Sequence, residues 1–185
     1  PTVEGEDRYF EVYDDIQRLE SLHALAHNPE IVQAMRAAIG ETAFPHPLGI
    51  ARLGFPRNEE ATTPPHQDFP NNQGTTELYA CWIPLGDCPR QLGGLSVLES
   101  SHKLGLLPLE FSLGAGSRQA VVPEAAKQLR WLSTDYRCGD ILIFGSLNLH
   151  RSLPNNSGNR FRLSVDFRYQ CEGLPPADEE GNSDP

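Results

Sequence analysis

The first forty residues and the rest of the chain differ in the spacing of their apolar positions. In residues 13–27, apolar side chains recur at three-residue steps along one helical face, at Ile16, Leu19, Leu22 and Leu25. Residues 28–40 predict a further helix, with Asn28 as its N-cap, Pro29 in the first turn and Gly40 at its end. We therefore expect N-terminal α-helices over residues 8–40.

From residue 45 onward, short apolar runs are separated by Pro, Gly and Asn, which is typical of an all-β sandwich or barrel. The candidate strands are 48–55, 77–85, 94–100, 130–136, 140–150 and 160–170. We expect this all-β core to occupy residues 45–171. The long, Gly-containing segment 103–127 has few strand signals, and loops of this length are often functional lids. It either covers the open mouth of the barrel or simply connects two elements.

The strand at 160–170 alternates sharply between apolar and polar residues. One face carries Phe161, Leu163, Val165 and Phe167, and the other carries Arg160, Arg162, Ser164, Asp166 and Arg168. The common explanation is a surface strand with a solvated outer face. The alternative is a small barrel whose apolar face packs on the helices and whose polar face lines a ligand cavity.

Composition limits the classes of protein to consider. A chain of 185 residues is long enough for one domain, which we place at residues 1–171. Residues 172–185 read as a disordered tail, in which the stretch 175–185 has four acids and no base. The net charge of -10 argues against a nucleic-acid partner. No apolar run is long enough to span a membrane.

Cysteine usage and the chain start give weaker information. The four cysteines form no CxxC pair, so a zinc ribbon or a thioredoxin motif is unsupported and reduced thiols are expected. The chain begins at Pro1 without a Met and without a signal-like segment, so we expect a cytoplasmic protein that lacks an N-terminal part. Nothing in the sequence specifies an oligomeric state.

A His and an Asp lie two residues apart in TTPPHQDFP (62–70). In a strand, His66 and Asp68 would project from the same face and could present an imidazole and a carboxylate to one metal ion. The flanking Pro64 and Pro65 fit an ordinary surface turn equally well. His-x-Asp is a common pair, so it predicts a site only together with other residues.

A second candidate ligand follows the buried apolar run 141–144. On strand parity, His150 shares a face with Leu142 and Phe144, although a histidine at such a place is more often a core residue than a ligand. Together with His66 and Asp68 it completes two histidines and one carboxylate, which is the ligand set of non-heme Fe(II) oxygenases. That set leaves coordination positions open for an oxo-acid and dioxygen.

Two arginines follow this histidine on the polar face of the last strand. An oxo-acid bound to iron has a distal carboxylate, and the planar fork of Arg binds carboxylates in a bidentate way. Arg160 and Arg162 are both candidates, and Ser164 on the same face can add a hydroxyl hydrogen bond. Each arginine taken alone is also an ordinary surface residue.

In order and spacing, five motifs resemble the phytanoyl-CoA dioxygenase family from about residue 45 to 171: HQDFP, LYACWIPLGD, GGLSVLESSHKLG, GDILIFGSLNLHRSLPNNS and RFRLSVDFRYQ. The resemblance implies a double-stranded β-helix (a jelly roll, cupin-like) that uses Fe(II), 2-oxoglutarate and O2. It implies His66, Asp68 and His150 as metal ligands and Arg162 as the partner of the distal carboxylate of 2-oxoglutarate. Ser152 and Trp82 fall where family members contact this cosubstrate.

The implied activity is hydroxylation of a small-molecule or acyl-type substrate, with release of succinate and CO2. Related halogenases have a small residue in place of the carboxylate, so Asp68 favours hydroxylation, with desaturation and epimerisation as alternatives. The chain departs from the family pattern in lacking an initial strand and helix, and its spacing keeps Arg160 as a rival of Arg162. The alternative from another class is a non-enzymatic jelly-roll binding module with a structural metal.

Overall fold

Helices precede a series of short strands in the computed structural model, which describes residues 7–57, 62–112 and 118–175. The helices are α1 (Asp7–Gln17), α2 (Glu20–Leu25) and α3 (Pro29–Ile39), in agreement with the expected helical region. The elements that follow are β1 (Ala43–Gly54), α4 (Phe69–Asn72), β2 (Tyr79–Pro84), η2 (Arg90–Leu92), β3 (Leu95–Leu98), η3 (Ser101–Leu104), β4 (Leu109–Phe111), β5 (Arg118–Ala120), η4 (Glu124–Ala126), β6 (Trp131–Leu132), β7 (Leu142–Gly145), β8 (His150–Ser152) and β9 (Arg162–Cys171). Most of the predicted tail, residues 176–185, lies outside the described residues. None of the described helices is long and apolar enough to cross a membrane.

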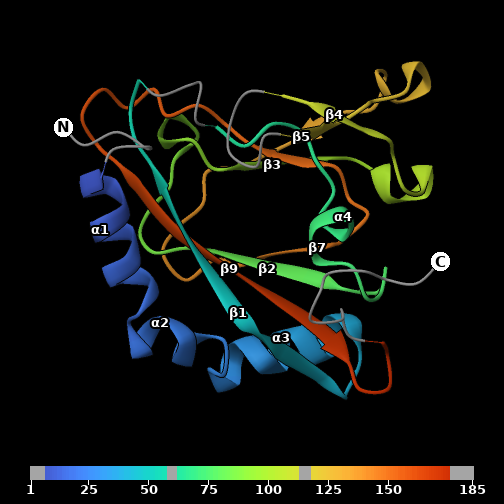
Figure 1. Ribbon diagram of the computed structural model, residues 1–185, viewed down its shortest axis with the longest axis horizontal. Coiled ribbons are helices and arrows are strands. Elements are labelled where there is room, and N and C mark those ends of the chain that lie inside the picture. Colours follow the sequence, from blue (N-terminus) through green and yellow to red (C-terminus); the bar gives the residue numbers. More distant parts are fainter. Residues whose placement is uncertain (1–6, 58–61, 113–117, 176–185) are drawn as a thin grey trace.

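The described strands form one larger sheet and two smaller ones. The larger sheet has the order β1-β9-β2-β7, and all of its neighbours are antiparallel. The smaller sheets are β6-β3-β8 and the pair β4-β5. Figure 1 shows α1, α2 and α3 along one side of the larger sheet, with β3, β4 and β5 on its other side. A mostly β core with N-terminal helices is therefore confirmed.

Each face of the larger sheet contributes to a different apolar cluster. Helix residues such as Leu22 and Met35 pack against Val165, Phe167 and Tyr169, which are the outward-facing residues of β9. Between the sheets, a second cluster contains Ala80, Trp82, Cys88, Leu92, Leu95, Tyr136 and Phe144. The alternate residues of β9, among them Arg162, Ser164, Asp166 and Arg168, are polar and also buried. The prediction that the apolar face packs on the helices and the polar face turns inward is therefore confirmed within β9, whereas Arg160 and Phe161, which precede the strand, are exposed.

Two predicted elements are broken in the structure. The helical face expected over residues 13–27 is split between α1 and α2, and Leu19 at the break is 51% exposed. The break coincides with a tie to the sheet, because the side chain of Gln17 accepts a hydrogen bond from Ala51 N at 3.0 Å.

The single strand expected over residues 140–150 is two strands, β7 and β8, that belong to different sheets. Asn148 closes the turn between them: its side-chain Oδ1 accepts from Gly145 N at 3.0 Å, and its own N–H donates to Gly145 O at 2.9 Å. The assumption of one continuous strand was therefore wrong, since His150 begins β8, although His150 still lies beside Phe144 with ring centroids 4.4 Å apart. This turn places His150 on the sheet β6-β3-β8, which faces the polar side of β9.

Candidate metal and cosubstrate site

His66 and His150 lie side by side because their backbones pair. The N–H of each residue donates to the carbonyl of the other, at 2.9 and 3.0 Å, which forms an isolated antiparallel bridge. Directly paired residues project on the same face, and the two ring centroids are 4.1 Å apart. This bridge joins the loop that carries the His-x-Asp sequence to the first residue of β8.

Asp68 reaches the same point from a helical start rather than from a strand. Its backbone is helical, at φ -74° and ψ -32°, and it immediately precedes α4. The assumption that His66 and Asp68 share a strand face was therefore wrong for Asp68. Even so, Asp68 Oδ1 lies 3.8 Å from His66 Nε2 and 3.7 Å from His150 Nε2. The ligand atoms of the three residues all lie within 4.8 Å of one another, so the predicted convergence is present.

The residue between them, Gln67, fixes the loop. It is fully buried. Its amide nitrogen donates to Gly105 O and Leu147 O, both at 2.8 Å, and its oxygen accepts from Leu107 N at 2.8 Å. This amide therefore ties the His-x-Asp loop to the segment 103–127 and to the β7–β8 turn.

The two histidines are oriented with their Nε2 atoms toward the shared space. Nδ1 of His66 lies 2.9 Å from Pro64 O, and Nδ1 of His150 lies 3.0 Å from Asn148 O. A carbonyl oxygen can only accept, so Nδ1 carries the proton in each neutral ring and Nε2 presents a lone pair. This tautomer is the one that ligates a metal through Nε2.

The protonation states also suit a cation. Burial, with the neighbouring His150, lowers the pKa of His66 to about 3, and burial lowers the pKa of His150. Burial by itself raises the pKa of Asp68, but the charges of Arg168 and the two histidines outweigh it and lower the pKa to about 2. At neutral pH, two lone pairs and a carboxylate therefore face one another with no proton between them. A divalent cation satisfies all three groups, so the residues fit the predicted metal.

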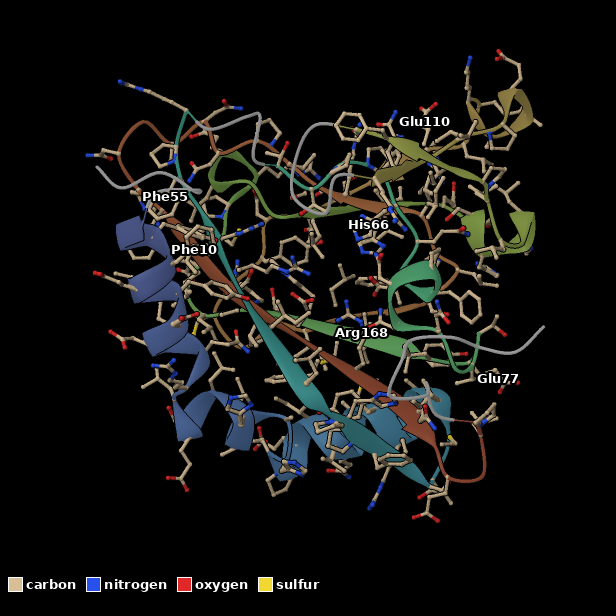
Figure 2. The ribbon with its side chains drawn as sticks, viewed as in Figure 1. Phe10, Phe55, His66, Glu77, Glu110 and Arg168 are labelled. Carbon is tan, nitrogen blue, oxygen red and sulfur yellow. The ribbon has the colours of Figure 1, made fainter. Side chains whose placement is uncertain are left out.

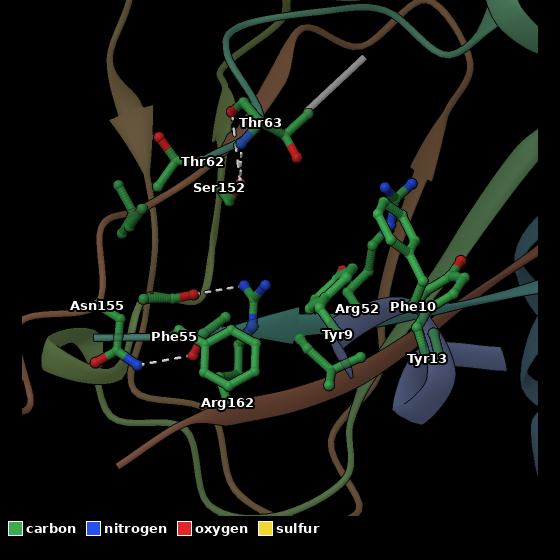
Figure 3. Close-up of a pocket in the computed structure, with 15 residues that line it drawn as sticks. Tyr9, Phe10, Tyr13, Arg52, Phe55, Thr62, Thr63, Ser152, Asn155 and Arg162 are labelled. Atoms are coloured by element: carbon green, nitrogen blue, oxygen red, sulfur yellow. Dashed lines mark hydrogen bonds between the residues drawn. The ribbon is translucent and has the colours of Figure 1, made fainter. Parts of the chain in front are cut away.

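A small cavity joins this cluster to the polar face of β9. The metal-side cavity has a volume of about 30 Å³, and its lining includes His66, His150, Trp82, Ser152 and Arg162. It adjoins a larger cavity of about 200 Å³, which we call the aromatic cavity because Tyr9, Phe10, Tyr13 and Phe55 line it (Figure 3). The two cavities share Arg52, Thr63, Ser152 and Arg162 as lining residues.

Arg162 has the properties of a carboxylate partner. It is only 7% exposed, and Nη1 donates to Gly93 O at 2.5 Å, whereas its buried Nε has no hydrogen-bond partner among the described residues. Gly93 adopts φ +80°, and a Cβ there would lie 2.5 Å from Leu153 O, so only glycine can place this carbonyl beside Arg162. A buried guanidinium with an unused donor, facing a cavity beside the histidines, fits the distal carboxylate of an oxo-acid.

The other predicted cosubstrate residues differ in their positions. Ser152 lines both cavities, and its Oγ accepts from Thr63 N at 2.8 Å. Trp82 lines the metal-side cavity and donates through Nε1 to Ser164 Oγ at 3.1 Å. Ser164 is fully buried and does not line that cavity, so it holds Trp82 in place; its predicted bond to the cosubstrate remains a prediction. The rival Arg160 is exposed and does not line the metal-side cavity either.

A model of the family described as phytanoyl-CoA dioxygenase (PhyH) matches residues 2–164. The chain belongs to the phytanoyl-CoA dioxygenase family. Its relatives include a 1-deoxypentalenic acid 11-beta-hydroxylase of Streptomyces exfoliatus, 28% identical over 163 residues, which cover 79% of this chain and 56% of the relative. The hydroxylase of the same name from Streptomyces arenae is 28% identical over 157 residues, with the same coverage. The chain thus spans little more than half the length of these curated relatives.

Solved structures similar to this phytanoyl-CoA dioxygenase family member support its fold. The epimerase SnoN, in complex with Fe3+, alpha ketoglutarate and nogalamycin RO, has a TM-score of 0.70 at 19% identity, over 93% of this chain and 70% of SnoN. EvdO2 from Micromonospora carbonacea var. aurantiaca, complexed with 2-oxoglutarate, has a TM-score of 0.60 at 19% identity, over 83% and 64% of the two chains. The predicted iron and 2-oxoglutarate agree with the ligands named for these neighbours.

One residue that the sequence did not single out contacts the candidate metal ligands. Arg168 of β9 lies beneath His66 in Figure 2, and its Nη2 is 2.9 Å from Asp68 Oδ2. Strand parity already placed it on the same face as Arg162 and Ser164. Its partner could not be identified from sequence, because Asp68 comes from a distant loop.

Proposed function

We propose that the chain is an Fe(II)- and 2-oxoglutarate-dependent dioxygenase that hydroxylates a small-molecule or acyl-type substrate. The observation that carries this proposal is the convergence of His66, Asp68 and His150 beside a cavity that ends at the buried Arg162. The antiparallel sheets and the likeness to the neighbours above support a double-stranded β-helix as their scaffold. His66, Asp68 and His150 would hold the metal.

When bound, the iron and its cosubstrates supply the oxidation: 2-oxoglutarate, O2 and R–H give succinate, CO2 and R–OH. The protein binds and orients. Arg162 binds the distal carboxylate through the unused donors of its guanidinium, and Ser152 and Trp82 shape the walls of the metal-side cavity. No separate acid–base residue is proposed. The name of SnoN keeps epimerisation as an alternative outcome at the same site.

The segment 103–127 contributes to a third space, the His66 cavity, of about 80 Å³, whose lining includes His66, Leu109 and Arg118. We propose that this segment forms part of the substrate-binding wall, where excluded water and a closely held C–H bond are needed. Among the leucines of this segment, Leu107 is buried in a separate apolar cluster that Leu104 packs against, and Leu106 is 56% exposed. Leu109 lines this cavity. Gly114 and Gly116 of the same segment lie outside the described residues.

The proposed function is tested by supplying the chain with Fe(II), 2-oxoglutarate and O2 against a panel of small molecules, including terpenoid acids and acyl conjugates. Succinate formation is followed, and products are identified by mass spectrometry. A gain of one oxygen that depends on substrate and 2-oxoglutarate supports hydroxylation. A non-enzymatic binding module would release no succinate with any substrate, and His150→Ala provides the matched inactive control.

A further inference from the structure

Four buried or half-buried side chains of alternating charge extend from the candidate metal site to the aromatic cavity. Arg168 Nη2 lies 2.9 Å from Asp68 Oδ2, and Arg168 Nη1 lies 3.1 Å from Asp166 Oδ2. Arg52 closes the series, with its Nε 3.1 Å and its Nη2 3.3 Å from the two oxygens of Asp166. The proposed oxidation uses only the first of these residues, Asp68, so the other three require an explanation.

The two oxygens of Asp68 have different surroundings. Oδ1 faces His66 Nε2 and His150 Nε2, at 3.8 and 3.7 Å, whereas Oδ2 faces Arg168. Oδ2 is buried and makes no hydrogen bond of good geometry to any described residue, so the ion pair with Arg168 is its main contact. The orientation of this carboxylate therefore depends on one guanidinium.

Arg168 is held more rigidly than the residue that it contacts. It lies on β9, which pairs with both β1 and β2 in the larger sheet, whereas Asp68 lies in a loop just before α4. Its side chain is 7% exposed and is fixed from behind by Asp166, whose carboxylate is held in turn by Arg52. A strand in the interior of a sheet thus supports a loop ligand, as precise sites require.

We propose that Arg168 is a positioning residue that holds Asp68 so that only Oδ1 can reach the metal. The inference rests on the proposed function, because it assigns a role toward the metal held there. A carboxylate can bind a metal through one or both oxygens. With Oδ2 engaged by Arg168, Asp68 would take one coordination position, and the positions not taken by His66 and His150 would remain open to the cosubstrates. Asp166 and Arg52 support Arg168 and do not contact the ligands themselves.

The test measures the binding of Co(II) alone to the full chain, by titration calorimetry and by the visible absorption of the bound ion. We expect Arg168→Met, which keeps the length but removes the charge, to weaken Co(II) binding about 10–100-fold and to change the spectrum. Arg168→Lys should fall between Arg168→Met and the unchanged protein. Arg160→Met, which removes the same charge from an exposed position, is the matched control and should leave both readouts unchanged.

The opposite result is also physically possible. If Arg168 served only to neutralise Asp68, its removal would leave the carboxylate more attractive to a cation, and Co(II) affinity would stay constant or rise. That outcome overturns the proposal. Should Arg168→Met fail to fold, as judged by circular dichroism, Asp166→Asn decides the matter: it removes the support of Arg168, a smaller loss of affinity is expected, and no loss contradicts the proposal.

Failure of the proposed function would be distinguishable. If the unchanged protein bound no Co(II), or if His66→Ala, Asp68→Ala and His150→Ala left Co(II) binding unaltered, the metal site itself would be refuted, and the inference about Arg168 with it. Binding that depends on the three ligands but not on Arg168 would leave the proposed function intact and overturn the positioning role alone.

Discussion

Both faces of β9 are largely buried, but for opposite reasons. Val165, Phe167 and Tyr169 face the helices and are fully buried among apolar neighbours, where burial itself is favourable. Arg162 and Arg168 on the inner face are almost equally buried, at 7% and 6% exposed, where burial is costly unless each charge has a partner. The outer face stabilises the fold. The inner face holds the charges that we propose bind 2-oxoglutarate and orient Asp68.

The largest effect should come from the inner face. Losing one partner of a buried charge pair costs on the order of 3–5 kcal/mol, so Arg162→Ala should weaken 2-oxoglutarate binding by about two to three and a half orders of magnitude. Metal binding should remain largely intact, because Arg162 is not one of the three candidate ligands. Calorimetric titration of the metal-loaded protein with 2-oxoglutarate measures the first quantity, and titration of the metal-free protein with Co(II) measures the second.

Arg160→Ala is the control for this change, since Arg160 is exposed and precedes the start of β9 by two residues. It should alter the affinity for 2-oxoglutarate only slightly. An equal or larger loss at Arg160 would mean that the wrong arginine has been assigned to the carboxylate.

The outer face should show the reverse separation. Val165→Ala removes two buried methyl groups at about 0.8 kcal/mol each and leaves a small cavity, so it should lower the free energy of unfolding by about 2 kcal/mol. At temperatures where the variant is folded, its affinity for 2-oxoglutarate should equal that of the unchanged protein. Chemical denaturation and the titration above provide the two readouts. A parallel loss of affinity for 2-oxoglutarate would contradict the separation of roles between the two faces.

The free energy of unfolding should also depend on pH, through the buried histidines that face the inner side of β9. The pKa of His66 is lowered to about 3 from its ordinary value of 6.5, chiefly by burial, so below pH 6.5 the unfolded chain takes up a proton that the folded chain does not. Stability is therefore full above pH 6.5 and should fall by about 1.4 kcal/mol per pH unit from this residue as the pH drops toward 3. His150 and, at lower pH, Asp68 act in the same direction.

Denaturant unfolding of metal-free protein at several pH values measures this slope. His66→Gln should make the dependence shallower, whereas His27→Gln, at an exposed position on the helical side, should leave it unchanged. A slope that is insensitive to His66→Gln would show that the acid sensitivity arises elsewhere.

Substitutions in the segment 103–127 should change stability least, and their expected effect is on the coupling of oxidation to the substrate. Leu109→Ala should reduce product formed per succinate released while leaving 2-oxoglutarate binding unchanged, because Leu109 lines the His66 cavity. Leu106→Ala is the matched control, since Leu106 is 56% exposed, and surface changes of this kind usually alter stability by less than about 0.5 kcal/mol. If the two variants couple oxidation to substrate equally well, the segment is only a connector.

Local patterns in the sequence predicted a large part of the fold and of the candidate site. The two faces of β9 follow from a two-residue alternation, and the start of α3 follows from the Asn28 cap, whose side chain accepts from Glu30 N at 2.9 Å. Both features depend on residues close together in the chain, so they can be read without knowing the fold. The candidate ligands and Arg162 were found from residue type and spacing, together with the family resemblance.

Features that depend on distant contacts could not be predicted in this way. The approach of His66 to His150 depends on an isolated bridge between the loop that carries His66 and the first residue of β8. The partner of Arg168 depends on the helical backbone of Asp68, where strand parity gave the wrong geometry. Each of these contacts joins segments whose sequences carry no local sign of the other.

We propose that His66, Asp68 and His150 hold a metal ion and that Arg162 binds the distal carboxylate of 2-oxoglutarate beside it. The most direct measurement is the visible spectrum of the protein under anaerobic Fe(II) as 2-oxoglutarate is added. We predict a weak charge-transfer band that saturates with one equivalent of iron, needs far more 2-oxoglutarate in Arg162→Ala, and is absent in His150→Ala. No band in the unchanged protein, or a band that His150→Ala leaves intact, would contradict the claim.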